Sequence, residues 1–302
     1  PHGARGRDAR IRRFDLPVTD VRENEQLSIE IQRNVSQALA EDVGTGDLTA
    51  RLIPPGRAAQ GLVTAREEAV LCGRDWFEAC LRALDPKATV AWHVPEGEWV
   101  APDQKLCEIL SETRALLTAE RAALNFVQLL SATATMTRRF VDAIGGTSAR
   151  IVDTRKTLPG LRLAQKYAVR IGGGLNHRMG LYDGILIKEN HIMAAGGIRP
   201  VLARARGIAP SNAFIQIEVE TLAQLREALD AGATMVLLDN MSIDQMREAV
   251  AINDDRAELE ASGGVDLDRV RAIAETGVDR ISIGVLTKNV RAIDLSLRHV
   301  ER

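Results

Sequence analysis

The spacing of apolar residues along the chain predicts two parts of different character, which meet near residue 145. Before that point, short alternating runs typical of β-strands are mixed with helical stretches. These runs predict strands at 60–65, 69–72, 89–94 and 105–110, and a helix at 75–84. From 112 to 144 the apolar positions recur at helical spacing without proline. Because this stretch is long for one helix, we expect a break near 130–132.

After Gly145 and Gly146 the pattern alternates regularly between a strand and a helix. Strands are predicted at 151–153, 184–188, 214–219, 235–239, 257–261 and 280–284, and helices at 161–171, 200–206, 222–231, 243–251, 267–275 and 290–299. The predicted strands are apolar on both sides, which is typical of a parallel sheet covered by helices. This half of the chain therefore belongs to the α/β class.

The ends of the later strands recur with a regular period. Glu218, Asp239, Ser262 and Gly284 follow one another at intervals of 21, 23 and 22 residues. Consecutive βα units of a barrel give such a period. Six strands are fewer than the eight of a complete barrel, so the pattern predicts a short or open barrel, with a doubly wound sheet as the alternative.

Polar residues follow almost every predicted strand of this half. In a parallel barrel the substrate site lies at the C-terminal ends of the strands. The residues at these ends are Asp153 to Lys156, Lys188 to His191, Glu218 to Glu220, Asp239, Asn240, Ser262 to Gly264, and Gly284. So many polar ends in succession favour an active site over ordinary loops.

Charge and glycine placement indicate an anionic, phosphorylated substrate. Residues 151–188 contain seven Lys/Arg and two acids, whereas 189–268 contain six Lys/Arg and fourteen acids. In one barrel, a cationic side suited to a multiply anionic substrate would face carboxylates suited to a divalent metal or sugar hydroxyls. The Ser262–Gly264 turn between a strand and a helix, together with Gly284, predicts a phosphate site. The glycines at 172–174 follow a helix, which excludes a dinucleotide fingerprint, and we interpret them as a connection that delivers His177 and Arg178.

Composition narrows the class of protein further. A length of 302 residues predicts about two domains. A net charge of −2 provides no basic field for nucleic acid, and no apolar run approaches the ~20 residues of a membrane span. The first thirteen residues carry five arginines without a following apolar segment, so we expect no secretory signal. Cys72, Cys80 and Cys107 lack metal-ligand spacing, and we expect reduced thiols and a cytoplasmic location.

Several motifs together resemble those of the quinolinate phosphoribosyltransferase family. They are EDVGTGDLT at 41–49, ERAALN at 120–125, DTRKTLPG at 153–160, GGLNHR at 173–178, IKENH at 187–191, EVE at 218–220, LDN at 238–240, ASGGV at 261–265 and IGVLT at 283–287. The resemblance extends from about Val35 to Leu297. It implies an N-terminal α/β sandwich domain over 1–130, completed by the tail 291–302, and an open barrel of six to seven parallel strands over 131–290.

The resemblance also implies an activity. The family enzyme, nicotinate-nucleotide diphosphorylase (carboxylating), joins quinolinate to phosphoribosyl pyrophosphate in the presence of Mg²⁺. The products are nicotinate mononucleotide, pyrophosphate and CO₂, in de novo NAD biosynthesis. The family further implies a homodimer whose active sites are shared across the interface.

Site residues follow from the resemblance position by position. The implied quinolinate-binding residues are Arg121 (from the partner subunit), Thr154, Arg155, His177, Arg178 and Lys188. The implied phosphoribosyl pyrophosphate-binding residues are Lys156, Glu218, Asp239, Ser262, Gly263, Gly264, Gly284 and Lys288. Lys156, Lys188, Glu218 and Asp239 are the implied catalytic residues, and Glu218 and Asp239 hold Mg²⁺ directly or through substrate or water. Lys288 stands where many members have histidine, so a cation is retained at that position.

Three alternatives remain open from the sequence. A related phosphoribosyltransferase would act on another pyridine-like acid. A barrel aldolase would use Lys188 as a Schiff-base lysine and the Ser262–Gly264 turn for substrate phosphate, but it leaves Arg121, Arg155 and Arg178 unexplained. A non-catalytic protein that binds small anions would bind ligand without turnover.

Overall fold

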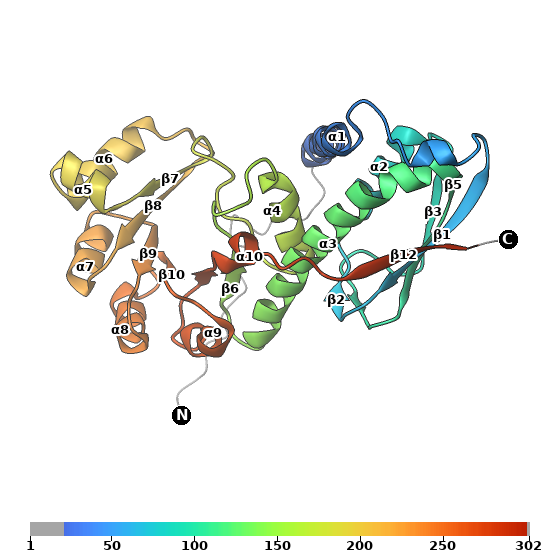
Figure 1. Cartoon of the computed structure of the whole chain (residues 1–302). Helices are drawn as coiled ribbons and strands as arrows, with labels where there is room; N and C mark the ends of the chain where they lie inside the picture. Colours follow the sequence, from blue (N-terminus) through green and yellow to red (C-terminus); the bar gives the residue numbers. More distant parts are fainter. Residues whose placement is uncertain (1–20, 301–302) are drawn as a thin grey trace.

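The computed structural model describes residues 21–300, and the arginine-rich first thirteen residues lie outside this range. Two domains are joined end to end, with the helices and strands of the barrel on one side and the antiparallel sheet on the other (Figure 1). Over the described range, no helix combines the length and the apolar character needed to cross a membrane.

The N-terminal domain is an antiparallel sheet covered by helices. Its strands run in the order β12-β1-β5-β3, with bounds Leu295–Val300, Ala58–Ala65, Lys105–Glu112 and Thr89–Trp92. A short ribbon pairs β2 (Ala69–Val70) with β4 (Trp99–Val100). The helices are α1 (Val21–Val43), the 3₁₀ turn η1 (Ala50–Leu52), α2 (Arg74–Leu84) and α3 (Thr113–Ala143). The predicted strands and the helix at 75–84 are confirmed to within a few residues, whereas α1 was not predicted.

The C-terminal tail is a strand, so the predicted helix at 290–299 is wrong. Strand β12 pairs antiparallel with β1, and Leu62 lies opposite Arg298. The alternation of Leu295, Leu297 and His299 fits a half-buried edge strand, with Leu295 turned into the core. The tail therefore completes the N-terminal sheet, as the family resemblance implies.

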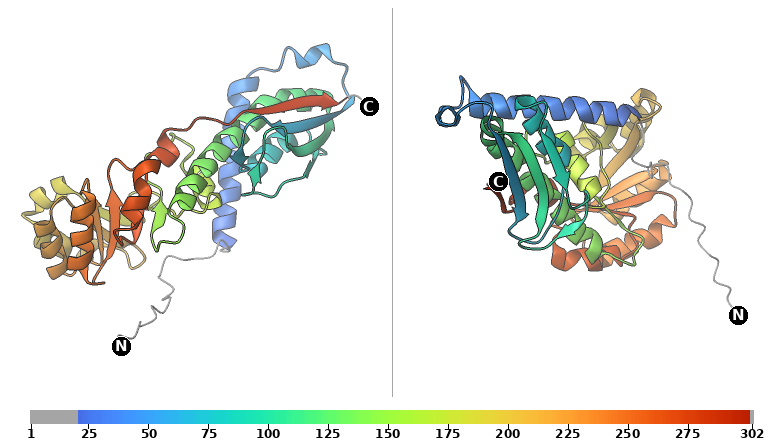
Figure 2. Two further views of the ribbon diagram at one scale, coloured as in Figure 1. Left: turned by 90° about the horizontal axis from the view of Figure 1, so that it is seen from below. Right: turned by 90° about the vertical axis from the view of Figure 1, so that its right-hand side faces the viewer.

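Helix α3 is continuous from Thr113 to Ala143, so the predicted break near 130–132 is wrong. The polar side chains in this part of the helix form hydrogen bonds without interrupting it. The Ser131 hydroxyl donates to the Cys72 carbonyl (3.0 Å) and accepts from the Cys72 N–H (2.8 Å), while the Thr135 hydroxyl accepts from the Val70 N–H (2.8 Å). These hydrogen bonds fasten α3 to β2 and the residues just after it, and the helix runs from the N-terminal domain to the barrel (Figure 2).

The C-terminal domain is an open barrel of six parallel strands in the order β6-β11-β10-β9-β8-β7. Their bounds are Arg150–Val152, Arg280–Ser282, Glu258–Ser262, Met235–Asp239, Phe214–Val219 and Gly184–Ile187. A parallel bridge between Val152 and Leu175 extends the free edge of β6 at the place of a seventh strand. The predicted short or open barrel is confirmed.

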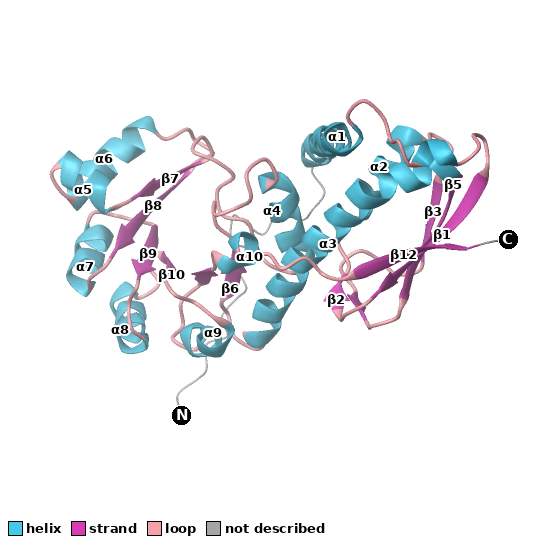
Figure 3. Cartoon of the chain, in the orientation of Figure 1, coloured by secondary structure: helices cyan, strands magenta, loops and turns pink. Residues whose placement is uncertain are grey.

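Helices surround the outside of this curved sheet (Figure 3). They are α4 (Arg162–Ile171), α5 (Glu189–Ala195), α6 (Ile198–Ile208), α7 (Leu222–Asp230), α8 (Ile243–Asn253), α9 (Leu267–Ala274) and α10 (Val285–Lys288). Thr221 and Ser242 start α7 and α8 with capping boxes, in which their hydroxyls accept from the N–H three residues on. Helices α5 and α10 were not predicted, because both are too short to show a clear apolar period.

The inner face of the barrel carries buried polar residues among its apolar ones, which corrects the expectation that the strands are apolar on both sides. Gln216 on β8, Glu260 on β10 and Arg280 on β11 are buried. The outward residues Val236 and Leu238 of β9 belong to the apolar core beneath the helices. A closed ring of interior apolar side chains is not needed in an open barrel, where hydrogen-bonded polar groups occupy the interior.

Candidate active site

A cleft of 460 Å³ lies at the C-terminal ends of the barrel strands. The sequence-predicted residues that line it are Thr154, Lys156, Lys188, Glu218, Asp239, Ser262, Gly263, Gly264, Gly284 and Lys288. Asn240, a predicted strand-end residue, lines it too, as does Ser282, which was not predicted. The strand-end argument thus brings together residues from six different strand–helix units.

The Lys156 loop after β6 is bound to the loop after β11. The Thr287 hydroxyl donates to the Lys156 carbonyl (2.8 Å), and the amide of Gln165 donates to the Thr287 carbonyl (2.9 Å). A Cβ on Gly284 would lie 3.1 Å from Cδ of Lys156, so the lysine stem lies directly over this glycine. Gln165 and Thr287 are fully buried, and they therefore fix the separation between Lys156 and the loop that starts α10.

The turn after β10 requires glycine. Gly263 and Gly264 have φ angles of 99° and 56°, a region that side chains disfavour. A Cβ on Gly263 would lie 2.1 Å from Oδ1 of Asn240. Asn240 itself has a φ of 53° and donates to the Asp239 carboxylate (2.8 Å). The ends of β9 and β10 thus approach each other closely and leave a hollow lined by backbone, of the kind that binds phosphate.

Two guanidinium groups lie beside this cleft. Burial, with the positive charge of Arg155 as the next cause, lowers the pKa of Arg178, and Asp183 opposes the shift. Nε of Arg155 is buried and has no hydrogen-bond partner among the described residues. Arg178 donates to the Gly184 carbonyl (3.0 Å), which turns it along β7. Two cations brought together with an unused buried donor indicate a binding site for an anion.

Opposite charges meet at the ends of β7 and β8. The Lys188 ammonium lies 3.3 Å from the Glu218 carboxylate. Lys188 also starts α5, and its N–H donates to the ring Nδ1 of His191 (2.9 Å). Asp239 ends the next strand, so two carboxylates stand on neighbouring strands facing the cations of the Lys156 loop. Residues of the predicted cationic and anionic sides therefore line one mouth, and Lys188 and Glu218 meet there.

Four of the predicted site residues do not line this cleft: Arg121, Arg155, His177 and Arg178. Arg121 is exposed on the domain-joining helix α3 and does not line the cleft of its own chain. The His177 side chain is 8% exposed and is enclosed by the barrel interior. Arg155 lies between the cleft residues Thr154 and Lys156 in the sequence, and its positive charge acts on Arg178.

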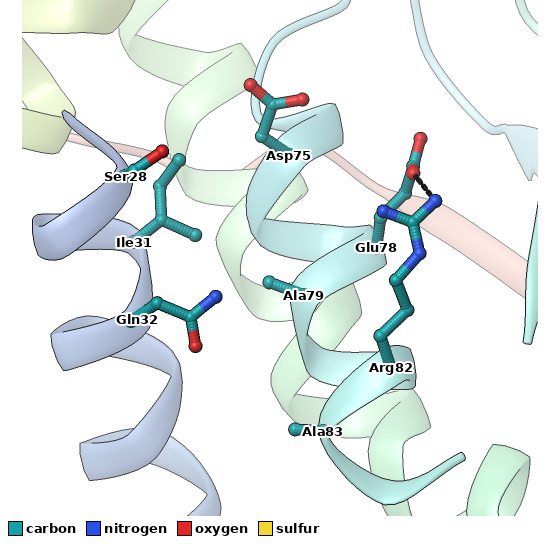
Figure 4. A pocket seen from close by; sticks show the side chains of 8 residues that line it. All are labelled: Ser28, Ile31, Gln32, Asp75, Glu78, Ala79, Arg82 and Ala83. Atoms are coloured by element: carbon teal, nitrogen blue, oxygen red, sulfur yellow. Dashed lines mark ion pairs between the residues drawn. The ribbon is translucent and has the colours of Figure 1, made fainter. Parts of the chain in front are cut away.

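A second hollow of 330 Å³ lies between α1 and α2 in the N-terminal domain (Figure 4). Its charged side chains are Asp75, Glu78 and Arg82, and the last two form an ion pair (2.6 Å). None of the residues predicted to act on substrate lines it. Apart from Arg121 on α3, the site residues predicted from the sequence all belong to the barrel domain.

Comparison with known proteins assigns both domains to one family. A model described as the C-terminal domain of quinolinate phosphoribosyl transferase matches residues 133–298. A second model, described as the N-terminal domain of the same enzyme, matches residues 47–131. The two matches together cover most of the chain.

Individual relatives agree with these matches. The probable nicotinate-nucleotide pyrophosphorylase (carboxylating) of Bacillus subtilis (strain 168) is 39% identical over 269 residues, covering 89% of this chain and 93% of the relative. The corresponding protein of Mycobacterium leprae (strain TN) is 42% identical and covers 87% and 95%. The solved structure of the nicotinate-nucleotide pyrophosphorylase from Francisella tularensis superimposes with a TM-score of 0.87 at 44% identity, covering 90% of this chain and 96% of the other.

Proposed function

This chain belongs to the quinolinate phosphoribosyltransferase family, and we propose that its barrel mouth performs that family's reaction. It transfers the phosphoribosyl group of phosphoribosyl pyrophosphate to quinolinate, with loss of CO₂, and yields nicotinate mononucleotide for NAD biosynthesis. The observation that supports this most directly is the paired Arg155 and Arg178 with an unused buried donor, beside a cleft with phosphate-binding character.

Quinolinate matches the cationic side of the mouth. Its two carboxylates lie on adjacent ring carbons, so it needs several cations close together in a partly desolvated site. Arg155 and Arg178 provide two guanidinium groups, and the Lys188 ammonium stands at the end of β7, the strand whose first residue, Gly184, binds Arg178. Guanidinium groups suit carboxylates because they donate two parallel hydrogen bonds. A mono-acid would leave one of these cations without a partner.

Phosphoribosyl pyrophosphate matches the side of the mouth that carries the glycine turn and the two carboxylates. The Ser262–Gly264 turn and Gly284 hold the 5-phosphate, with Lys288 beside them. In this proposal Glu218 and Asp239 hold the ribose hydroxyls, and Lys156, whose stem lies over Gly284, contacts phosphoribosyl pyrophosphate. In this arrangement the ring nitrogen faces C1 of the ribose.

The reaction then needs positioning more than a strong base. The quinolinate nitrogen forms a bond to C1 as the bond from C1 to pyrophosphate breaks, and the leaving group takes the electron pair. The ribosylated pyridinium next accepts the electrons of the adjacent C–COO⁻ bond, CO₂ departs, and the ring carbon takes up a proton from solvent. Fixed cations around the pyrophosphate and the carboxylates stabilise the developing charges, so Lys156, Arg155 and Arg178 act chiefly by electrostatics.

Magnesium fits the two carboxylates of the cleft. Within the described residues, no group of three or more His, Cys, Asp or Glu side chains could hold a metal by itself. Mg²⁺ is commonly bound by one or two carboxylates together with substrate phosphates and water, and Glu218 and Asp239 provide that number. When bound, the ion neutralises pyrophosphate charge. Glu218 keeps its other contact, with Lys188.

We propose a homodimer with shared active sites. Arg121 is exposed on α3 and lies outside the cleft of its own chain, which suits a role in the partner's site. Exposed apolar side chains occur on both domains, at Leu48 and Leu52 in one and at Leu181 and Tyr182 in the other. Burial of such side chains between subunits is favourable. A cytoplasmic location stays a prediction, supported by three buried cysteines without disulfides.

The Lys188 ion pair weakens the aldolase alternative. A Schiff-base lysine attacks as an uncharged amine in an apolar or cationic setting. Lys188 lies instead against a carboxylate, which suits a lysine used as a cation. Borohydride trapping of a substrate imine on Lys188 would support the aldolase.

One assay decides the reaction. The protein is mixed with quinolinate, phosphoribosyl pyrophosphate and Mg²⁺, and CO₂ and nicotinate mononucleotide are measured, with nicotinate as substrate in a parallel reaction. We expect both products from quinolinate and little turnover of nicotinate. Equal turnover of nicotinate would favour a related enzyme for another pyridine-like acid, and binding without turnover would favour an anion-binding protein.

Subunit mixing decides whether the site is shared. Arg121→Ala and Lys156→Ala homodimers should each be nearly inactive. After denaturation and refolding together, about half of the dimers should be mixed, with one intact site each, and activity should recover to about 25% of wild type. No recovery, with mixed dimers confirmed by mass, would mean that Arg121 acts within its own subunit.

A further inference from the structure

A buried polar chain runs beneath the barrel mouth and ends on His177. It joins Glu260 on β10 to Gln216 on β8, and Gln216 to the His177 ring. Glu260 is 1% exposed and Gln216 is fully buried. Neither residue lines the cleft, and this burial keeps both from direct contact with a ligand there.

The chemistry of each group fixes the direction of every hydrogen bond in this chain. An ionised carboxylate only accepts, so the amide nitrogen of Gln216 must face Glu260 (Nε2 to Oε2, 3.0 Å). The amide oxygen of Gln216 then faces His177 Nε2 at 2.8 Å, and this ring nitrogen must be the donor. A carboxylate thus determines, through an intervening amide, which nitrogen of the histidine carries hydrogen.

The other polar atoms of His177 also form hydrogen bonds. Its Nδ1 accepts from the Arg178 N–H (2.7 Å), which requires an unprotonated Nδ1 and agrees with hydrogen on Nε2. Its backbone N–H donates to Asp153 (2.8 Å), and its carbonyl accepts from the Lys166 ammonium (2.9 Å). The ring of Phe214 packs edge-on against the imidazole, with centroids 5.3 Å apart. His177 therefore has no ring nitrogen left for substrate.

We propose that Glu260 and Gln216 are positioning residues, which hold His177 as the neutral Nε2–H tautomer and thereby set Arg178 against Arg155. The bond from the Arg178 N–H to the imidazole fixes the backbone from which the Arg178 side chain starts. Oε1 of Glu260 is buried and finds no hydrogen-bond partner within residues 21–300, a cost that a purely structural interior would avoid with an apolar pair. The inference rests on the proposed function, because quinolinate is the anion that this arginine would bind.

Glu260→Gln tests the proposal in the full-length enzyme. The side chain keeps its shape but gains a donor, so the Gln216 amide can turn and offer its N–H to His177 Nε2. The Gln216 and Arg178 N–H groups then compete for the one unprotonated ring nitrogen, and the bond that holds Arg178 is weakened. We expect the KM for quinolinate to rise about tenfold or more, since a misplacement near 1 Å can cost up to ~100-fold. The KM for phosphoribosyl pyrophosphate should stay within about twofold. The ¹⁵N spectrum of labelled histidine, assigned with His177→Asn, should lose the signature of a protonated Nε2 beside an unprotonated Nδ1.

Glu258→Gln is the matched control. Glu258 lies on the same strand and pairs with Arg280 (2.6 Å) at the other end of the barrel. Glu258→Gln should leave the His177 tautomer unchanged, and likewise the ratio of the KM for quinolinate to the KM for phosphoribosyl pyrophosphate, even if it lowers the stability of the protein. Should Glu260→Gln fail to fold, Gln216→Met with Glu260→Met removes both partners without leaving a buried charge and should give the same rise in quinolinate KM.

The outcomes separate the two ideas. The proposal is overturned if Glu260→Gln leaves either the His177 tautomer or the KM for quinolinate at its wild-type value. It is also overturned if both KM values rise equally in Glu260→Gln and Glu258→Gln, because that pattern indicates general damage. A wild-type enzyme that fails to convert quinolinate would refute the proposed function, while the histidine spectrum of the unliganded protein would still report the tautomer.

Discussion

Replacing Arg155 with methionine should affect stability and activity in opposite directions. In the free protein, the Arg155 guanidinium contributes to the lowered pKa of Arg178, and its buried Nε has no partner among the described residues. An unsatisfied buried donor costs about 1–3 kcal/mol. Methionine keeps most of the apolar stem and removes both the donor and the repulsion. We therefore expect the Tm of Arg155→Met to equal or exceed that of wild type, by about 2 °C for each kcal/mol gained.

The same substitution should remove much of the catalytic efficiency. Removing the charged partner of a desolvated carboxylate costs about 2–5 kcal/mol of binding free energy. At 1.36 kcal/mol for each factor of ten, kcat/KM for quinolinate should fall by roughly 30- to 5,000-fold. Quinolinate at 100 times its Kd should stabilise wild type by about 2.7 kcal/mol and raise its Tm accordingly. It should raise the Tm of Arg155→Met far less.

Arg162→Met is the control for this prediction. Its guanidinium is satisfied by the Thr157 hydroxyl (3.1 Å) and the carbonyls of Met179 (3.0 Å) and Arg155 (3.4 Å). Arg162→Met should therefore lower the Tm. If Arg155→Met lowers the Tm as much as Arg162→Met does and keeps near-normal kcat/KM, the assignment of Arg155 to an anion site is wrong.

Three further predictions concern the carboxylates and the glycine turn. Glu218→Ala and Asp239→Ala should raise the KM for phosphoribosyl pyrophosphate and change the Mg²⁺ dependence but leave quinolinate affinity alone; unchanged constants in both variants would contradict their role. Gly263→Ala should abolish use of phosphoribosyl pyrophosphate, because its Cβ would lie 2.1 Å from Asn240 Oδ1, and calorimetric binding of the substrate at wild-type strength would disprove this. Hydrogen bonds from a backbone N–H and a threonine hydroxyl lower the pKa of Asp47 below 3.8. The stability this carboxylate contributes is therefore present above pH ~4 and lost as pH falls through its lowered pKa, so Asp47→Asn should lose less Tm than wild type between pH 5 and pH 3.

The sequence predicted the barrel mouth well because one geometric rule governs it. Strand ends spaced 21 to 23 residues apart must meet at the same edge if the strands are parallel. Glu218, Asp239, Ser262 and Gly284 accordingly line a single cleft. This prediction depends only on the period of the pattern, so errors of one or two residues in the strand bounds did not affect it.

The two wrong elements depended on partners that lie far away in the sequence. The tail 295–300 is a strand because β1, more than 200 residues earlier, offers it an edge. Helix α3 continues through Ser131 because Cys72 takes up both hydrogen bonds of the hydroxyl. Local propensity is a weak guide where tertiary contacts of this kind decide the outcome.

The buried residues beneath the mouth were missed although their pattern was visible. Gln216 and Glu218 are two residues apart on β8, as are Glu260 and Ser262 on β10, so each pair points to the same face of its strand. In each pair the later residue lines the cleft, and the earlier one lies a layer deeper in the barrel. A polar residue two positions before a strand-end site residue therefore marks the layer that supports the site. A count of charges along the sequence does not reveal this layer, because it treats Glu260 as one more acid of the anionic side. Glu260 is in fact hydrogen-bonded to Gln216, which is hydrogen-bonded in turn to His177 on the cationic side of the barrel.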